Sequence, residues 1–235
     1  MLLVPALFGQ FFNAPEDYYQ RADFATLLRL LRYLSLFIAL LAPSIYITFT
    51  TFHQELLPTT LLVSLAGQRE GVPFPAFVEA LMMEITFEIL REAGVRMPKT
   101  IGQSVSIVGT LVIGQSAVEA GIVSPAMVIV VAITAIANFV IPAFSMGISI
   151  RMLRMAMMGL AASFGLFGLI LGVIALILHL CSLQSFGVSY MSPFAPLVPA
   201  ELKDSIIRLP RRIKLFGSGS TGKKKVRQKT EGHDP

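Results

Sequence analysis

Long apolar windows alternate with short charged segments along the chain. Uncharged windows of about 20 residues have the length needed to cross the hydrocarbon core of a bilayer. Four spans are therefore expected, at residues 33–52, 101–118, 123–141 and 155–180. The turn at 119–122 is so short that the second and third spans must form an antiparallel hairpin. The pattern predicts an all-α integral membrane protein with about four transmembrane helices.

A polar stretch separates the first two spans. Between His53 and Lys99 it holds six Glu, three Arg and one Lys. Residues 77–92 predict an amphipathic helix in this long first loop, because Glu84, Glu88 and Glu92 recur every four residues. Such a helix either lies in the membrane interface or dips into the bundle, and both placements are open at this point.

The remaining segments complete the expected organisation. Residues 1–32 predict an N-terminal interfacial segment, and residues 33–216 form the membrane domain. Residues 217–235 are rich in Gly and Ser and then in Lys, which predicts a disordered basic tail. Arg151 and Arg154 are expected in a loop before the last span.

Two features inside the spans predict local geometry. Pro43 lies in the middle of the first span, where it should kink the helix unless neighbouring groups satisfy the carbonyl that it leaves free. The last span is rich in glycine, and the Gly168-x-x-x-Gly172 spacing allows close helix approach in lipid.

Composition and charge exclude an ordinary water-soluble domain. Only 14% of the residues are charged, against roughly 25% in soluble proteins, and the mean hydropathy is +0.73. Ten of the nineteen Lys and Arg follow residue 200, so the net charge of +5 describes one end of a membrane protein and gives no reason to expect nucleic acid. The excess of basic residues in the terminal regions predicts that both termini are cytoplasmic.

The residues that carry catalysis are scarce. The three histidines are scattered, the expected spans contain no Asp, and the single cysteine, Cys181, offers no metal-site spacing. The sequence therefore predicts a protein that is not an enzyme and that uses no cofactor or metal.

One face of the second span is small and partly polar. At 100° per residue, Gln103, Ser106, Thr110, Gly114 and Ala117 fall within about 80° of one another. Small residues and hydroxyls are common where membrane helices pack tightly. The same groups can line a water-filled path for an ion. These five residues are the candidate pore-lining set, with helix packing as the alternative.

Three carboxylates are candidates for a pore mouth. Glu119 stands in the short turn at the membrane edge, where several copies around one axis would form a ring that favours cations. Glu84 and Glu88 belong to the acidic row of the 77–92 helix, and would concentrate cations if that helix packed at a pathway. The alternative for Glu119 is a solvated turn residue, and for the row a solvated helix face.

Several long strings resemble the GerA family, the A subunits of nutrient germinant receptors in spore-forming bacteria, with their SpoVAF-type relatives. The resemblance covers about Pro5 to Arg212. The strings that carry it are Ala14-Pro-Glu-Asp-Tyr-Tyr19, the segment from Glu70-Gly-Val-Pro-Phe-Pro75 to Lys99, Ile101-Gly-Gln103, and Val118-Glu-Ala-Gly-Ile-Val-Ser-Pro125. Family members carry a large soluble region before this part, which leaves open a split, truncated or membrane-only version here.

The resemblance implies a function and partners. An A subunit of this family is expected to form an oligomeric ion channel in the cell membrane, specifically the spore inner membrane. The channel triggers ion release during germination together with a B subunit and a lipoprotein C subunit. A homo-oligomer in contact with membrane lipid is expected. The alternative is a non-conducting membrane scaffold subunit of the same receptor complex.

Overall fold

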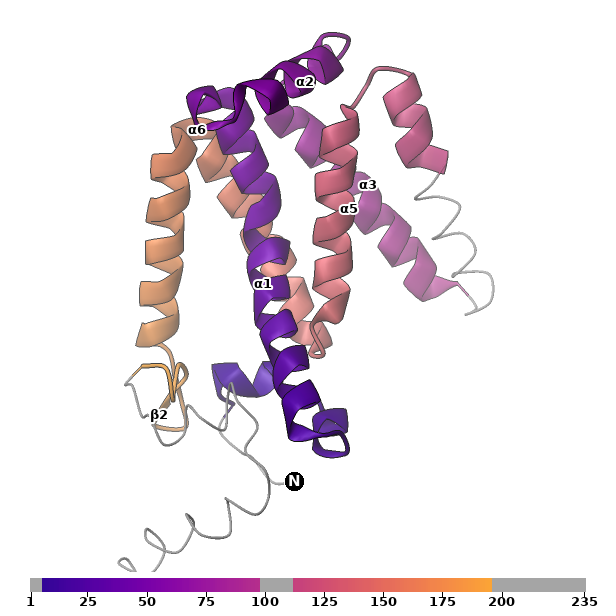
Figure 1. Ribbon diagram of the computed structural model, residues 1–235. Coiled ribbons are helices and arrows are strands. Elements are labelled where there is room, and N and C mark those ends of the chain that lie inside the picture. The colour runs from indigo at the N-terminus through magenta and orange to yellow at the C-terminus, as the bar shows by residue number, and fades with distance from the viewer. Residues whose placement is uncertain (1–5, 98–111, 196–235) are drawn as a thin grey trace, which may run out of the picture. The chain divides into compact units, whose positions relative to one another are not determined.

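The computed structural model describes residues 6–97 and 112–195, and within them the protein is mostly helical (Figure 1). The elements, in chain order, are η1 (Phe8–Phe12), η2 (Pro15–Tyr18), α1 (Ala22–Thr51), η3 (Gln54–Leu56), α2 (Thr59–Arg69), α3 (Ala76–Arg96), α5 (Pro125–Val140), α6 (Phe144–Ser182), β1 (Gln184–Ser185) and β2 (Val188–Ser189). Residues 112–119 are also helical. The helical class agrees with the sequence, and α3 lies where a helix was expected in the first loop. The amphipathic pattern expected for it is wrong, because α3 buries Glu79 and Glu84 while Ile85 and Ile89 are exposed.

The chain divides into two compact units, one formed by residues 1–31 and 183–235 and the other by residues 32–182. In the first, β1 and β2 form an antiparallel ribbon that pairs Gln184 with Ser189. The Phe8 amide donates to the Tyr190 carbonyl at 2.9 Å, and burial raises the pKa of the Tyr190 hydroxyl. Asp17 and Arg29, both almost fully buried, form an ion pair at 3.4 Å.

In the second unit, α6 does not run straight. Its backbone leaves the helical region at Gly165, with φ 60° and ψ −137°, and the chain reverses there (Figure 1). A Cβ built on Gly172 would lie 2.8 Å from Met157 Sδ, although fifteen residues of straight helix would separate the two by about 22 Å. A Cβ on Gly168 would clash with the Leu160 carbonyl oxygen. The two arms therefore touch at glycines, as the Gly168-x-x-x-Gly172 spacing predicts.

This reversal changes two expectations from the sequence. The helix begins at Phe144, so Arg151 and Arg154 lie inside α6 and not in a loop. The segment expected as one span at 155–180 contains the reversal at Gly165. A glycine is needed at that position because its φ lies in the left-handed region, which side chains with a Cβ rarely adopt.

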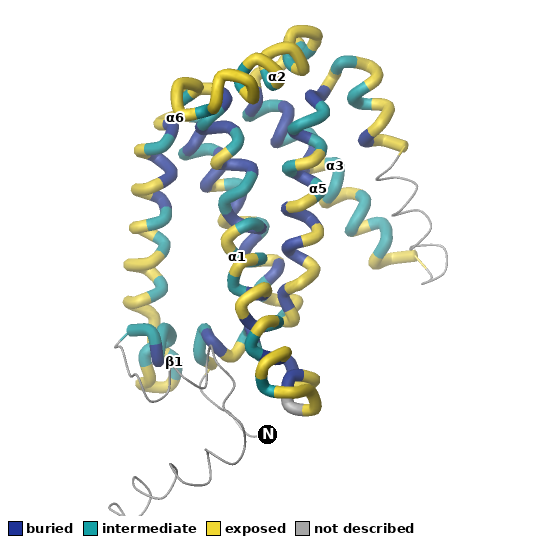
Figure 2. Tube along the Cα trace, in the orientation of Figure 1, coloured by how far each residue is buried: buried dark blue, intermediate teal, exposed yellow. Residues whose placement is uncertain are grey.

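The core of this unit consists of two clusters of apolar side chains. One joins Ile47 of α1, Met83 of α3, Met127 of α5 and Met158 of α6. The other joins α1, α5 and both arms of α6 through residues that include Leu40, Ala137, Met157 and Leu169. Helix α2 contains no buried residue, as its exposed colour in Figure 2 shows. The core thus belongs to α1, α3, α5 and α6.

Two helices among residues 6–97 and 112–195 are long and apolar enough to cross a membrane, α1 and α6. Helix α5 is also apolar but has only 16 residues. These helices support membrane association. The number of crossings stays a prediction.

Candidate functional site

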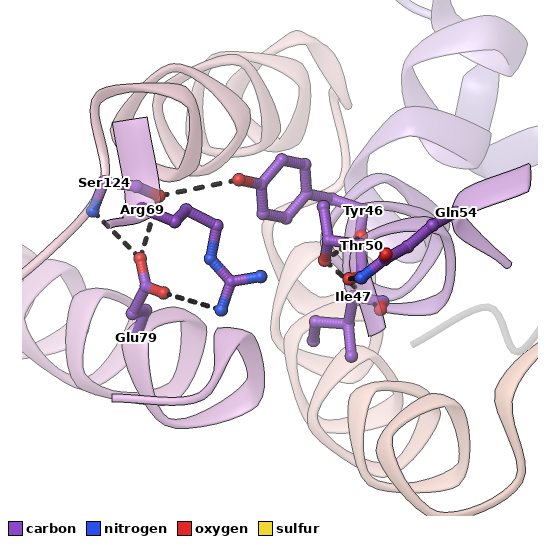
Figure 3. Close-up of polar contacts among 7 residues, drawn as sticks. All are labelled: Tyr46, Ile47, Thr50, Gln54, Arg69, Glu79 and Ser124. Atoms are coloured by element: carbon purple, nitrogen blue, oxygen red, sulfur yellow. Dashed lines mark hydrogen bonds and ion pairs between the residues drawn. The ribbon is translucent and has the colours of Figure 1, made fainter. Parts of the chain in front are cut away.

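Glu79 is the centre of a buried polar network that joins four segments of the chain (Figure 3). Its side chain is fully buried, and its Oε2 accepts hydrogen bonds from the amide and the hydroxyl of Ser124, at 2.9 and 2.8 Å. Arg69, the last residue of α2, forms an ion pair with Glu79 Oε1 at 3.3 Å. The Tyr46 hydroxyl of α1 lies 3.5 Å from the Ser124 hydroxyl. Glu79 therefore ties α1, α2 and α3 to the start of α5.

Local sequence explains why these groups meet. Pro75 precedes α3 and leaves Glu79 in its first turn. Ser124 is the N-cap of α5, with Pro125 as the first helical residue, but its own side chain does not cap the helix. Glu79 supplies the cap from α3, and a carboxylate at this position also meets the positive end of the α5 dipole. The turn before α5 lies close to the turn before α3, since a Cβ on Gly121 would be 3.2 Å from the Gly71 carbonyl oxygen.

A second buried contact joins α3, α6 and α1. Glu84 and Arg154 are each only 3% exposed, and Arg154 Nη2 forms an ion pair with Glu84 Oε2 at 2.5 Å. Arg154 Nη1 also donates to the Ala39 carbonyl at 3.3 Å. Pro43 follows Ala39 by four residues inside α1 and has no N–H to give. Arg154 is therefore the neighbouring group that satisfies the carbonyl freed by Pro43.

Further along α3, charged groups lie nearer the surface. Glu88 Oε2 pairs with Arg151 Nε at 3.1 Å and with Arg91 Nη1 at 3.5 Å. The two arginine side chains are mostly buried, whereas Glu88 is 48% exposed. The guanidinium carbon of Arg91 lies 5.0 Å from the ring centre of Phe139, a distance at which cation and ring attract. Two mostly buried arginines thus extend the charged part of this unit from Glu84 to the half-exposed Glu88.

The acidic row predicted on this helix splits in the structure. Glu84 is buried and paired, so it is not part of a solvated face. Glu88 is half-exposed and paired with two arginines. Glu92 is exposed and pairs with Arg96 of the same helix at 2.6 Å. The acidic row is split because α6 packs against α3 and brings Arg151 and Arg154 to Glu88 and Glu84.

The structure places some of the candidate pore residues and not others. Glu119 is exposed and accepts a hydrogen bond from Gln115 Nε2 at 2.8 Å. Gly114 is buried, and a Cβ on it would lie 3.5 Å from Val128 Cγ1 of α5. Ala117 is partly buried beside the Ile47 cluster. Gln103, Ser106 and Thr110 lie outside the described residues.

Sequence reasoning missed the two partners that organise the interior, Glu79 and Arg154. Pro43 indicated that a donor such as Arg154 was needed, because a proline inside an apolar helix leaves a carbonyl that requires a donor from outside the helix. Helical spacing places Glu79 on the far side of the helix from the acidic row, but it does not reveal the partners Arg69 and Ser124, which are 10 and 45 residues away. Among residues 6–97 and 112–195, no group of three or more His, Cys, Asp or Glu is arranged to hold a metal ion.

Comparison with known proteins gives one consistent result. The model of a family described as "Bacillus/Clostridium GerA spore germination protein" matches residues 1–215. The chain is 61% identical to spore germination protein KA of Bacillus subtilis (strain 168), over 89% of this chain and 39% of that protein. It is 48% identical to spore germination protein GerLA of Bacillus cereus, over 90% of this chain and 43% of the relative.

A further relative, the uncharacterized membrane protein YfkQ of Bacillus subtilis (strain 168), is 54% identical over 98% of this chain and 46% of its own length. The chain thus spans less than half the length of each of these relatives. No solved structure matches it.

Proposed function

Because the chain belongs to the GerA family of spore germination proteins, we propose that it is the membrane part of a nutrient germinant receptor A subunit. In this proposal several copies form an ion channel in the spore inner membrane, and its opening triggers ion release during germination. The B subunit and the lipoprotein C subunit are its partners, and both termini are cytoplasmic.

The observation that carries this proposal is the pair of buried carboxylates on α3. Glu79 and Glu84 are almost fully buried between helices that are otherwise apolar, and each is matched by an arginine from another helix. Charged residues are costly in a membrane, and those retained there face the interior and mark ion pathways.

The pore-lining face is proposed to be that of Gln103, Ser106, Thr110, Gly114 and Ala117, with Glu119 at one mouth. Hydroxyl and amide groups on this face would replace part of the hydration of a passing ion. The exposure of Glu119 supports its place at an opening. The contact of Gly114 with α5 favours the second candidate, a non-conducting scaffold in which this face only holds helices together.

Ion flux separates the channel from the scaffold. The purified chain would be reconstituted in liposomes, alone and with the B subunit, and potassium release would be measured. A channel gives flux, and Thr110→Lys should alter its rate or selectivity. The matched control is Val112→Lys, since Val112 is 52% exposed and falls outside the proposed lining face at 100° per residue. No flux in any assembly, or equal effects of both substitutions, would contradict the proposed lining.

A further inference from the structure

Five charged side chains of α3 and α6 form one cluster with an excess of positive charge. They are Glu84, Glu88, Arg91, Arg151 and Arg154, and their charges act on one another. Three guanidinium groups face two carboxylates, which leaves one positive charge uncompensated within the cluster. The side chains of Arg154, Arg151 and Arg91 are 3%, 13% and 14% exposed, so water compensates little of this charge.

Some donors in this cluster also lack an acceptor. Within the described part of the chain, Arg91 Nε, Arg91 Nη1 and Arg154 Nε are buried and have no hydrogen-bond partner. The 3.5 Å contact of Arg91 with Glu88 is an ion pair without hydrogen-bond geometry. A buried donor that makes no hydrogen bond costs free energy. An added anionic oxygen would therefore compensate the excess charge and accept hydrogen bonds from these donors.

The cluster lies where such an oxygen is available. The Arg91 guanidinium stacks on Phe139, the second-to-last residue of the apolar helix α5, and the Phe139 side chain is 71% exposed. The end of an apolar helix that meets a bilayer lies near the level of the lipid headgroups. The Glu88 side chain is 48% exposed, so the cluster is accessible from the outside at Glu88. A headgroup can approach from this side.

We propose that the Arg91–Arg151 side of this cluster binds one phosphate oxyanion, either the phosphodiester of an anionic lipid headgroup or a free phosphate. A guanidinium offers a planar pair of donors that fits two phosphate oxygens. Arg91 is the main ligand, since its Nε and Nη1 are buried without a hydrogen-bond partner, whereas Arg151 Nε pairs with Glu88 at 3.1 Å. Its buried N–H groups reach the oxyanion when the side chain turns outward past Glu88, and Arg151 supports the bound charge. Arg154 stays with Glu84 and Ala39.

Native mass spectrometry of the full chain tests this site. The protein would be titrated in detergent with phosphatidylglycerol, with phosphatidylcholine and with inorganic phosphate. The expected result is preferential retention of phosphatidylglycerol, reduced about tenfold in affinity by Arg91→Gln, the loss expected for one charge-assisted contact. Arg96→Gln is the matched control, because Arg96 lies on the same helix and pairs with Glu92 at 78% exposure. Displacement of the lipid by inorganic phosphate identifies free phosphate as the ligand, and persistence of the lipid identifies the headgroup.

A second variant gives an effect of opposite sign. Glu88→Gln raises the excess charge of the cluster from one to two and removes the carboxylate that competes for Arg91. Lipid or phosphate binding should therefore become tighter, which a misfolded protein would not produce. Equal affinities of Arg91→Gln and Arg96→Gln, or weaker binding by Glu88→Gln, would overturn the proposal. A normal far-ultraviolet circular dichroism spectrum of each variant establishes that the helices are intact.

Discussion

Arg154 donates a hydrogen bond to the carbonyl oxygen of Ala39, across 115 positions of sequence. This carbonyl is the one that Pro43 leaves without its helical donor. The same guanidinium holds Glu84. One side chain thus compensates a break in α1 and neutralises a buried carboxylate of α3.

Loss of the Arg154 guanidinium should be strongly destabilising. Arg154→Gln leaves the Glu84 charge buried without a partner, and breaking such a pair costs about 3–5 kcal/mol. Thermal unfolding in detergent, followed by circular dichroism, measures the change. Arg96→Gln breaks an exposed pair on α3 and is expected to cost about 0–1 kcal/mol. Similar losses for the two variants would contradict the buried pairing.

Restoring the missing backbone donor should relieve part of that loss. Pro43→Ala gives the Ala39 carbonyl an N–H from its own helix, so this carbonyl no longer depends on Arg154. In the double variant with Arg154→Gln, the loss should be smaller than the sum of the single effects by about 0.5–3 kcal/mol. The four proteins of this cycle are compared by the same unfolding measurement. Strict additivity would show that the two residues act independently.

Removal of the Glu79 carboxylate should loosen the start of α5. Glu79→Ala leaves the Ser124 amide buried without an acceptor, at about 1–3 kcal/mol for each unsatisfied group, and leaves Arg69 unpaired. Glu79→Gln keeps an acceptor oxygen and should cost less. Hydrogen exchange of the first turn of α5 reports the effect locally. Unchanged protection there in Glu79→Ala would show that the carboxylate does not cap this helix.

The reversal of α6 depends on glycine at position 165. In Gly165→Ala, the alanine must adopt a left-handed φ, at a backbone cost of about 1–3 kcal/mol. Its Cβ would also lie 3.0 Å from Phe52 and 3.2 Å from His53. Gly159→Ala is the control, because nothing lies within 4 Å of its Cβ position. Its helical backbone should instead gain about 0.5–1 kcal/mol. The two substitutions should therefore shift the unfolding temperature in opposite directions.

The hairpin of α6 also predicts which cysteines react with a thiol reagent added to the same side of a membrane. The exposed thiol of Cys181 and a cysteine at Ser145 in a Cys181→Ser background lie near the two ends of the hairpin. A membrane-impermeant maleimide should reach both from one side. A cysteine at Glu55, which follows the end of α1 near the reversal, should react from the other side. Labelling of Ser145→Cys and Cys181 from opposite sides would mean that α6 crosses as one straight helix.

The apolar windows of the sequence indicated where α5 and large parts of α1 and α6 lie, but not that the last window folds back at Gly165. The span expected at 123–141 overlaps α5, Pro125–Val140, and the helix expected at 77–92 lies inside α3, Ala76–Arg96. These elements follow from local signals, since the length of an apolar run, a proline at a helix start and a four-residue spacing all act within a few turns. The same local reasoning identified Pro43 as a place that needs an outside donor.

Only the tertiary structure decided which charges are solvated and which are buried. Glu84 and Glu92 occupy equivalent places in the same four-residue pattern, yet one is buried against Arg154 and the other is exposed beside Arg96. The difference arises from α6, whose arginines lie about 70 residues further along the chain. Gly165 differs from Gly159 in the same way, because Phe52 and His53 of a distant segment lie against Gly165 and nothing lies within 4 Å of the Cβ position of Gly159. Periodicity records the face on which a residue lies, but the partner of that face is fixed by packing between distant segments.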